Sequence, residues 1–245
     1  MSPVPGAGTP EAVWQEWPVL AALPVLDVAP CRRAVVVAPH PDDEALAVGG
    51  LMAVLLARGV PVVLVALTDG EASHPGSTVA TPEELRARRT VETAAALRAL
   101  GPGPLEHQRL HLPDGGLADH EDDVAGAISG MLGPGDWCIA PFTDDGHPDH
   151  DAAGRAAARA CATTRGRLLS YPLWAWHWAR PGDPRLPWSR ALRLPLPQSA
   201  RTRKEAALAC YPSQTAPLGP APEDAAVVPP AVLAHFLRPD EVLFA

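Results

Sequence analysis

Residues 34–44 read Ala-Val-Val-Val-Ala-Pro-His-Pro-Asp-Asp-Glu and decide the fold. The first five residues form a short, apolar, β-branched run, which is typical of a strand buried on both faces of a parallel sheet. The last five residues place one imidazole and three carboxylates directly after that strand. A helix is expected over residues 43–58, with Gly59 as its C-terminal cap. The stretch therefore predicts a strand, a polar turn and a helix.

Strands and helices are expected to alternate from this unit as far as residue 171. Such alternation indicates parallel strands joined by right-handed helical crossovers. Thr81, Pro82 and Glu84 have the spacing of a helix N-cap with a capping box. The other expected strands cover residues 61–67, 109–112, 136–140 and 167–171, and the other expected helices cover residues 82–100, 119–132 and 148–163.

The length of 245 residues predicts one domain. We expect an α/β fold: a Rossmann-like, open, mostly parallel sheet flanked by helices, with a loop-rich C-terminal third. Repeated prolines such as Pro3 and Pro5 interrupt regular structure. The expected parts are a Pro-rich arm over residues 1–33 with a short helical piece at 11–17, an α/β core with the metal site over 34–175, and a loop-rich part over 176–245 with a short helix at 201–210.

Composition excludes several classes of protein. Asp and Glu number 28 against 20 Lys and Arg, giving a formal net charge of -8, which argues against a nucleic-acid partner because phosphate binding needs clustered cations. No apolar run approaches the ~18–20 residues of a membrane span. The N-terminal residues lack the pattern of a secretory signal, so we expect a cytoplasmic protein. The four cysteines form no C-x-x-C pair and are expected to be free thiols.

A second polar cluster, His147-Pro-Asp-His150, follows the fourth expected strand. Ligands bind beyond the carboxyl ends of the strands in open parallel sheets, and both clusters are expected at that edge. An acidic Pro-Asp-Asp-Glu by itself is more typical of a solvated turn or of a helix start stabilised by the macrodipole. Two such clusters after two apolar strands instead predict a metal site.

The residue types in these clusters suit a catalytic zinc ion. Two imidazoles and one carboxylate, with a fourth position left to water, are typical of a catalytic rather than a structural zinc site. Zinc lowers the pKa of its bound water toward ~7. A second carboxylate would then accept the proton of the water, and a second histidine would protonate a leaving group or stabilise an oxyanion. Spacing alone does not assign these roles.

The two clusters resemble the signature motifs of the LmbE-like, or PIG-L, zinc-dependent N-deacetylases, the family of GlcNAc-PI de-N-acetylase. The similarity covers roughly residues 34–175. Further matching segments are Thr68-Asp-Gly-Glu71, Arg89-x-x-Glu92 with Leu100-Gly101, Leu112-Pro-Asp-Gly115 and Tyr171-Pro172, with weaker likeness at Lys204-Glu205 and Tyr211-Pro-Ser-Gln214.

The resemblance implies a role for each residue of the clusters. His40, Asp43 and His150 match the zinc ligands of the family, with one zinc ion per chain. Asp42 matches the general base that activates the metal-bound water. Ligand types leave the choice of divalent metal open.

Two further histidine-motif positions complete the implied catalytic set. His147 matches the residue that acts as an acid or stabilises the oxyanion, and Asp149 matches the residue that orients His147. Some relatives carry a tyrosine two residues before this histidine and use it on the carbonyl oxygen. This chain has Asp145 there, so oxyanion stabilisation would fall to zinc, to His147 or to another donor.

Arg89 and Asp114 match positions that contact the sugar in some relatives. Arg89 suits a surface ion pair with Glu92 equally well. Trp174, Trp176 and Trp178 form either a wall of the substrate pocket or packing between the C-terminal loops and the sheet, and packing is the favoured interpretation. His177 is not expected to be a ligand. No role is assigned to the remaining histidines, His74, His107, His111, His120 and His235.

The expected function is that of a single-domain zinc-dependent N-deacetylase, a hydrolase acting on a linear amide C–N bond. It would remove an N-acyl group, with N-acetyl as the expected one, from a small-molecule amino-sugar conjugate. One alternative is a metal-dependent amidase that cleaves a sugar-thiol or peptide-like amide conjugate. Another is a non-catalytic sugar- or nucleotide-binding module, although no G-x-G-x-x-G follows the first strand. No oligomeric state is predicted.

Overall fold

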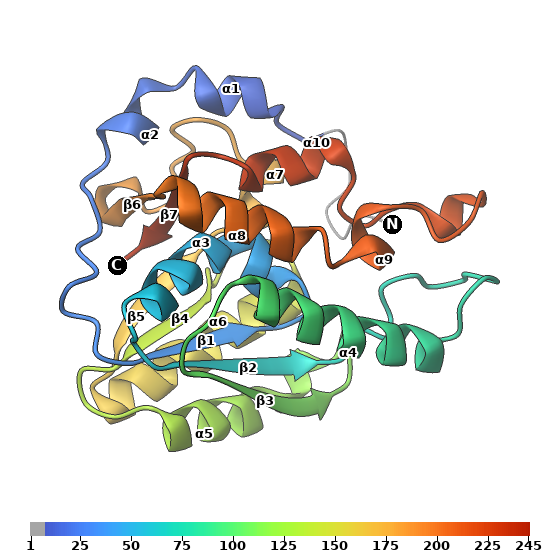
Figure 1. Cartoon of the computed structure of the whole chain (residues 1–245), viewed down its shortest axis with the longest axis horizontal. Coiled ribbons are helices and arrows are strands. Elements are labelled where there is room, and N and C mark those ends of the chain that lie inside the picture. Colours follow the sequence, from blue (N-terminus) through green and yellow to red (C-terminus); the bar gives the residue numbers. More distant parts are fainter. Residues whose placement is uncertain (1–7) are drawn as a thin grey trace.

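The structure is a computed structural model that describes residues 8–245, so Pro3 and Pro5 lie outside the described residues. Its centre is a seven-stranded sheet with strand order β3-β2-β1-β4-β5-β7-β6. Figure 1 shows helices on both sides of this sheet, and the predicted open, mostly parallel α/β fold is confirmed. The strands are β1 (Ala34–Ala38), β2 (Val62–Thr68), β3 (Leu105–Leu112), β4 (Trp137–Pro141), β5 (Arg167–Tyr171), β6 (Ala191–Pro195) and β7 (Asp240–Phe244).

The helices between the strands cover the two faces of the sheet. Along β1, Val36 and Ala38 belong to the core cluster that contains the apolar side chains of α3, whereas Val35 and Val37 belong to the cluster that contains those of α5 and α6. This alternation is the two-residue period of a strand buried on both faces. The longer helices are α3 (Asp43–Ala57), α4 (Pro82–Ala99), α5 (Glu121–Met131), α6 (Pro148–Thr164) and α8 (Gln198–Leu208).

Strand pairing brings the two polar clusters together. β1 pairs in parallel with β4, with Val36 opposite Ile139, so the carboxyl ends of both strands lie at the same edge of the sheet. α3 begins just beyond the end of β1, and α6 begins beyond the end of β4. The loops that carry the two clusters are therefore neighbours in space.

The expected elements up to residue 171 are present, with two differences. The third strand begins at Leu105 rather than at residue 109, because Leu105 to Arg109 pair with β2 along its length. Its side chains at 106–108 are polar and exposed at the edge of the sheet, so the local pattern did not indicate a strand. The expected helix 119–132 is a 3₁₀ turn, Leu117–His120, followed by α5.

The C-terminal third contains more regular structure than expected. β6 and β7 extend the same sheet beyond β5, and β7 runs antiparallel to both of its neighbours. α8 begins at Gln198, three residues before the expected start. Short pieces complete this region: α7 (Ala175–Trp178), α9 (Pro212–Thr215), α10 (Pro230–Leu233) and the 3₁₀ turns Trp188–Arg190, Pro222–Asp224 and Ala234–Phe236.

The N-terminal arm packs on this C-terminal region, as the blue segment in Figure 1 shows. It contains α1 (Glu11–Gln15), where the helical piece was expected, and α2 (Pro18–Ala22). Trp14 of α1 is fully buried, and its indole N–H donates to the carbonyl of Trp176 at 2.9 Å. Within residues 8–245, the helices are all too short or too polar to cross a membrane. The cysteines are free thiols, as expected.

Candidate active site

The turn after β1 holds Asp42 in a strained conformation. Its φ of 111° lies in the left-handed region, which residues other than glycine rarely adopt. The backbone N–H of Asp42 donates to the Glu44 carboxylate at 3.2 Å, and α3 starts at the next residue, Asp43. Strain of this kind concentrates at functional sites, where the surrounding structure enforces it.

His40, Asp43 and His150 lie together at the carboxyl edge of the sheet. Each offers one ligand atom, and these atoms lie within 4.8 Å of one another. The Nε2 atom of His150 is 3.3 Å from an oxygen of Asp43, and the Nδ1 atom of His40 is 3.4 Å from the same oxygen. Among the described residues, this buried Nε2 of His150 has no hydrogen-bond partner.

Asp145 determines which nitrogen of His150 faces the group. Its carboxylate lies 2.8 Å from Nδ1 of His150, and it also accepts the backbone N–H groups of Leu173, Trp174 and Ala175 at 2.8–3.0 Å. A carboxylate that accepts all of these donors keeps a proton on Nδ1 of His150, so Nε2 is the nitrogen that a metal ion would bind in place of a proton. Sequence reasoning gave Asp145 no such role, although a histidine that binds a metal commonly needs a carboxylate partner.

The charges of the group favour a bound cation. Burial alone would lower the pKa of His150, but the neighbouring Asp43 and Asp145 carboxylates outweigh burial and raise this pKa to about 9. For His40 too, the surrounding carboxylates outweigh burial and raise the pKa well above its usual value. The carboxylates thus carry a surplus of negative charge that a divalent metal would neutralise. Imidazole nitrogens with a carboxylate oxygen are also the donor set that zinc prefers.

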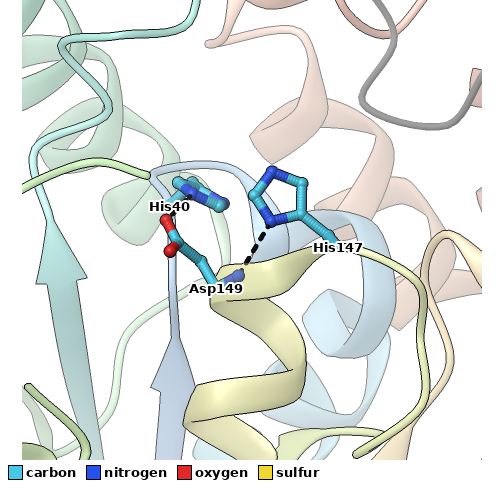
Figure 2. A group of neighbouring side chains, drawn as sticks. All are labelled: His40, His147 and Asp149. Atoms are coloured by element: carbon cyan, nitrogen blue, oxygen red, sulfur yellow. Dashed lines mark hydrogen bonds and ion pairs between the residues drawn. The ribbon is translucent and has the colours of Figure 1, made fainter. Parts of the chain in front are cut away.

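His40 also belongs to a second group, with His147 and Asp149 (Figure 2). The carboxylate of Asp149 lies 3.1 Å from Nε2 of His40 and accepts the backbone N–H groups of Gly115 and Leu117. Those two amides turn the Asp149 carboxylate toward His40 rather than toward His147. The contact to His147 comes instead from the backbone N–H of Asp149, which donates to Nδ1 at 3.2 Å.

Arg89 is buried behind Asp42. Its guanidinium lies 3.4 Å from the Asp42 carboxylate and donates to the carbonyls of Gly70 and Pro41. A Cβ atom on Gly70 would lie 2.0 Å from this guanidinium, so the close approach requires glycine. The alternative ion pair with Glu92 does not form, because Glu92 accepts hydrogen bonds from Ser213.

The surroundings of Asp42 make its carboxylate a better proton acceptor than an exposed one. Burial raises this pKa well above its usual value, and the positive charge of Arg89 offsets only part of the rise. A carboxylate with a raised pKa is a stronger base than one in water.

Asp114 also lies against the group. One of its oxygens is 3.2 Å from Nε2 of His40, and the other accepts the backbone N–H of Ala72 at 2.7 Å. Burial would raise the pKa of Asp114, but the hydrogen bond and charge of His40 outweigh it and lower the pKa to about 2.

A cavity of about 210 Å³ opens beside these residues. Its polar side includes Asp42, Arg89 and Asp114, and its apolar side includes Trp174 and Val228. The three tryptophans considered together in the sequence thus separate. Trp174 lines the cavity, Trp176 packs edge-on against Trp14, and Trp178 stacks against Arg185 at 4.1 Å.

The sequence of residues 35–161 matches the family model PIG-L, described as GlcNAc-PI de-N-acetylase. The chain belongs to the PIG-L family. Among curated PIG-L relatives, the probable N-acetyl-alpha-D-glucosaminyl L-malate deacetylase 2 of Bacillus cereus is 37% identical over 136 residues, which are 53% of this chain and 60% of that protein.

A second relative is the 1D-myo-inositol 2-acetamido-2-deoxy-alpha-D-glucopyranoside deacetylase of Nakamurella multipartita. It is 34% identical over 143 residues, which are 56% of this chain and 46% of that protein. The PIG-L chain thus spans about half the length of the curated relatives it matches.

Solved structures share the fold of this PIG-L chain. The conserved protein TT1542 from Thermus thermophilus has a TM-score of 0.54 and 32% identity, covering 74% of this chain and 79% of its own. The N,N'-diacetylchitobiose deacetylase from Pyrococcus horikoshii has a TM-score of 0.56 at 20% identity, covering 82% and 78%. GalB, a 4-carboxy-2-hydroxymuconate hydratase from Pseudomonas putida KT2440, has a TM-score of 0.56 at 19% identity, covering 75% and 80%. Because a hydratase shares it, this fold by itself does not define the reaction.

Proposed function

We propose that this chain is a zinc-dependent hydrolase that removes an N-acyl group, with acetyl as the expected one, from an amino-sugar conjugate. The observation that carries the proposal is the buried Nε2 of His150, which has no hydrogen-bond partner among the described residues and lies 3.3 Å from Asp43. Membership of the PIG-L family supports it. The names of the two curated relatives, which specify deacetylation of glucosaminyl compounds, support the substrate class.

In the proposed site, His40, Asp43 and His150 hold the metal ion. When bound, zinc would supply Lewis acidity and lower the pKa of a water molecule. Asp42 accepts a proton from the water as it attacks the acyl carbon, and Arg89 keeps the Asp42 carboxylate oriented. The same proton passes to the amide nitrogen as the C–N bond breaks, which gives a free amine and a carboxylic acid. The acid then loses its remaining proton to solvent and leaves as a carboxylate.

His147 is proposed to stabilise the negative charge that develops on the carbonyl oxygen. Its Nδ1 accepts the N–H of Asp149 at 3.2 Å, so the proton of the neutral ring is on Nε2. Burial and the neighbouring imidazoles of His40 and His150 lower the pKa of His147 to about 3, which keeps the ring neutral at pH 7. The Nε2–H group is then a hydrogen-bond donor for the developing oxyanion.

Because β6 and β7 complete the sheet, we propose that the chain acts as one domain.

The test is release of free amine by the zinc-loaded protein from a panel of N-acylated glucosamine conjugates and sugar–cysteine amides. Asp42→Asn should retain zinc and lower kcat at least about 100-fold, because general-base catalysis contributes typically 10²–10⁴-fold. Asp144→Asn is the matched control, since Asp144 is an exposed acid in the loop that follows β4.

Each outcome has a clear meaning. Amine release by the wild type but not by Asp42→Asn would establish both the reaction and the base. Full activity in zinc-loaded Asp42→Asn would rule out Asp42 as the general base. If zinc is bound but no conjugate is cleaved, the proposed reaction is wrong.

A further inference from the structure

The loop between β2 and α4, residues 69–81, forms one wall of the cavity beside the metal-binding group. Ala72, Ser73 and Pro75 line this wall. The backbone N–H of Ala72 donates to Asp114, whose other oxygen lies 3.2 Å from His40. Ser73 thus directly follows Ala72, whose backbone is hydrogen-bonded to a carboxylate of the cavity.

The side chain of Ser73 is hydrogen-bonded to His74. The side chain of Ser73 is half-buried, and its Oγ atom lies 3.0 Å from Nδ1 of His74. His74 is only 4% exposed. Burial, with a smaller contribution from the positive charge of Arg89, lowers the pKa of His74, so the ring is neutral at pH 7. Nδ1 of a neutral imidazole either accepts a hydrogen bond from the Ser73 hydroxyl or donates one to its oxygen. In both cases the hydroxyl can make a further hydrogen bond.

The loop is also tied to the segment that carries Val227 and Val228. The Ser77 hydroxyl donates to Asp224, which is 1% exposed and belongs to the segment that continues to Val227 and Val228. Those two valines line the cavity. This contact restrains the loop that carries Ser73, and a restrained loop loses less entropy when a ligand binds.

Two other polar side chains of the cavity, Arg89 and Asp114, already make several contacts within the protein. The Arg89 guanidinium bonds to two backbone carbonyls and faces Asp42, and Asp114 is shared between Ala72 and His40. The Ser73 hydroxyl lies at the cavity wall and makes one such contact, to His74, so it keeps hydrogen-bonding capacity for a ligand.

We propose that Ser73, positioned by His74, binds a hydroxyl group of the sugar substrate beside the metal-binding group. This inference rests on the proposed amino-sugar substrate. Ser73 would touch the substrate directly, and His74 would act through Ser73 by fixing the rotamer of its side chain.

The experiment compares Ser73→Ala with wild type on an N-acetylglucosamine conjugate and on analogues that each lack one ring hydroxyl. Loss of one hydrogen bond predicts a KM about 3- to 10-fold higher for Ser73→Ala, with kcat and zinc content unchanged. One deoxy analogue should show no further penalty in Ser73→Ala, because the two deletions remove the same interaction. Thr78→Ala, which removes an exposed hydroxyl from the same loop, is the matched control and should match the wild type.

Two variants of His74 separate positioning from folding. His74→Leu should reproduce the KM increase of Ser73→Ala. His74→Asn keeps a polar atom near the position of Nδ1 and should restore most of the wild-type KM. An unchanged KM in Ser73→Ala, or an equal penalty on every deoxy analogue, would overturn the proposal.

Calorimetry tests the Ser73 contact without any catalytic turnover. It measures the affinity of the zinc-loaded protein for glucosamine and for its deoxy analogues. If the wild type cleaves no conjugate, the proposed function fails, and the calorimetry still decides the role of Ser73. Weaker glucosamine binding by Ser73→Ala would support the contact. Equal affinity in both proteins, or no binding by the wild type, would exclude it.

Discussion

His147 and His150 lie one helical turn apart at the start of α6, yet their surroundings hold the proton on different nitrogens. The Asp145 carboxylate accepts a hydrogen bond from Nδ1–H of His150, whereas the Asp149 N–H group donates to Nδ1 of His147. A metal ion would therefore bind Nε2 of His150, whereas His147 presents a proton on Nε2. One motif thus supplies both a candidate metal ligand and a candidate oxyanion donor.

At this scale, replacement of Asp145 tests the candidate metal site. Asp145→Asn presents an amide N–H₂ group to donors that need an acceptor, so His150 would lose its fixed tautomer. We expect zinc affinity, measured by competition with a chelator, to fall about 10- to 100-fold, as for other partners of metal-bound histidines. Asp144→Asn, one residue earlier and exposed, should bind zinc as the wild type does. Unchanged affinity in Asp145→Asn would separate Asp145 from the metal site.

At the scale of elements, α3 carries Asp43 at its start and is kinked at Val48, where φ is -136°. The kink frees two backbone N–H groups within the helix, those of Gly50 and Leu51. The Glu241 carboxylate of β7 accepts both at 2.7 Å and pairs with the Lys204 ammonium of α8 at 2.8 Å. A side chain close to the end of the chain therefore caps the second half of α3.

Lys204→Met should reduce the stability of the protein strongly. The substitution leaves the Glu241 carboxylate buried without its cation, and breaking a buried pair in this way typically costs about 3–5 kcal/mol. Denaturant unfolding of Lys204→Met measures the loss, with the exposed neighbour Glu205→Gln as control. The double variant Lys204→Met/Glu241→Gln should recover part of the free energy of unfolding. A loss below about 1 kcal/mol in the single variant would contradict this account.

At the scale of the whole molecule, the N-terminal arm and the C-terminal region are joined by a partly buried ionic contact. The Glu11 carboxylate accepts two hydrogen bonds from Arg238, at 2.7 and 2.6 Å, and lies 2.7 Å from His235. Arg238 also stacks on Trp176 at 4.1 Å. These contacts hold α1 against the segment that contains His235 and Arg238.

The Glu11 contact predicts a pH dependence of stability. Burial would raise the pKa of Glu11, but Arg238 and His235 outweigh burial and lower it from 4.5 to about 2. The folded-state pKa lies below the unfolded value, so the stabilisation is complete above about pH 4.5 and is lost as the pH falls toward 2. At pH 7, Glu11→Gln should lower the free energy of unfolding by about 2 kcal/mol, as expected for hydrogen bonds to a charged group.

Denaturant unfolding at a series of pH values checks this prediction. The difference between the wild type and Glu11→Gln should shrink between pH 4.5 and pH 2. Glu16→Gln, an exposed acid just after α1, should show no such difference. A constant gap between the wild type and Glu11→Gln over that range would mean that the charge of Glu11 does not stabilise the folded state.

The sequence by itself was sufficient for the features that depend on local order. The apolar run of β1, the capping box of α4 and the alternation of strands and helices predicted the parallel sheet. Because the carboxyl ends of parallel strands lie at one edge of the sheet, the same pattern predicted that the clusters at His40 and His147 lie close together. Burial of the strand and the start of the next helix are decided within a few residues, so they can be read from the chain.

Only the tertiary structure decided the contacts between distant segments. Asp145 reaches His150 while it binds the amides of residues 173–175, and the Asp149 carboxylate turns to His40 because it binds amides near residue 116. The pairing of β6 with β7 and the cap that Glu241 places on α3 likewise join residues far apart in the chain. No local pattern encodes such partners, because each hydrogen bond forms only after packing of the core has brought its two groups together.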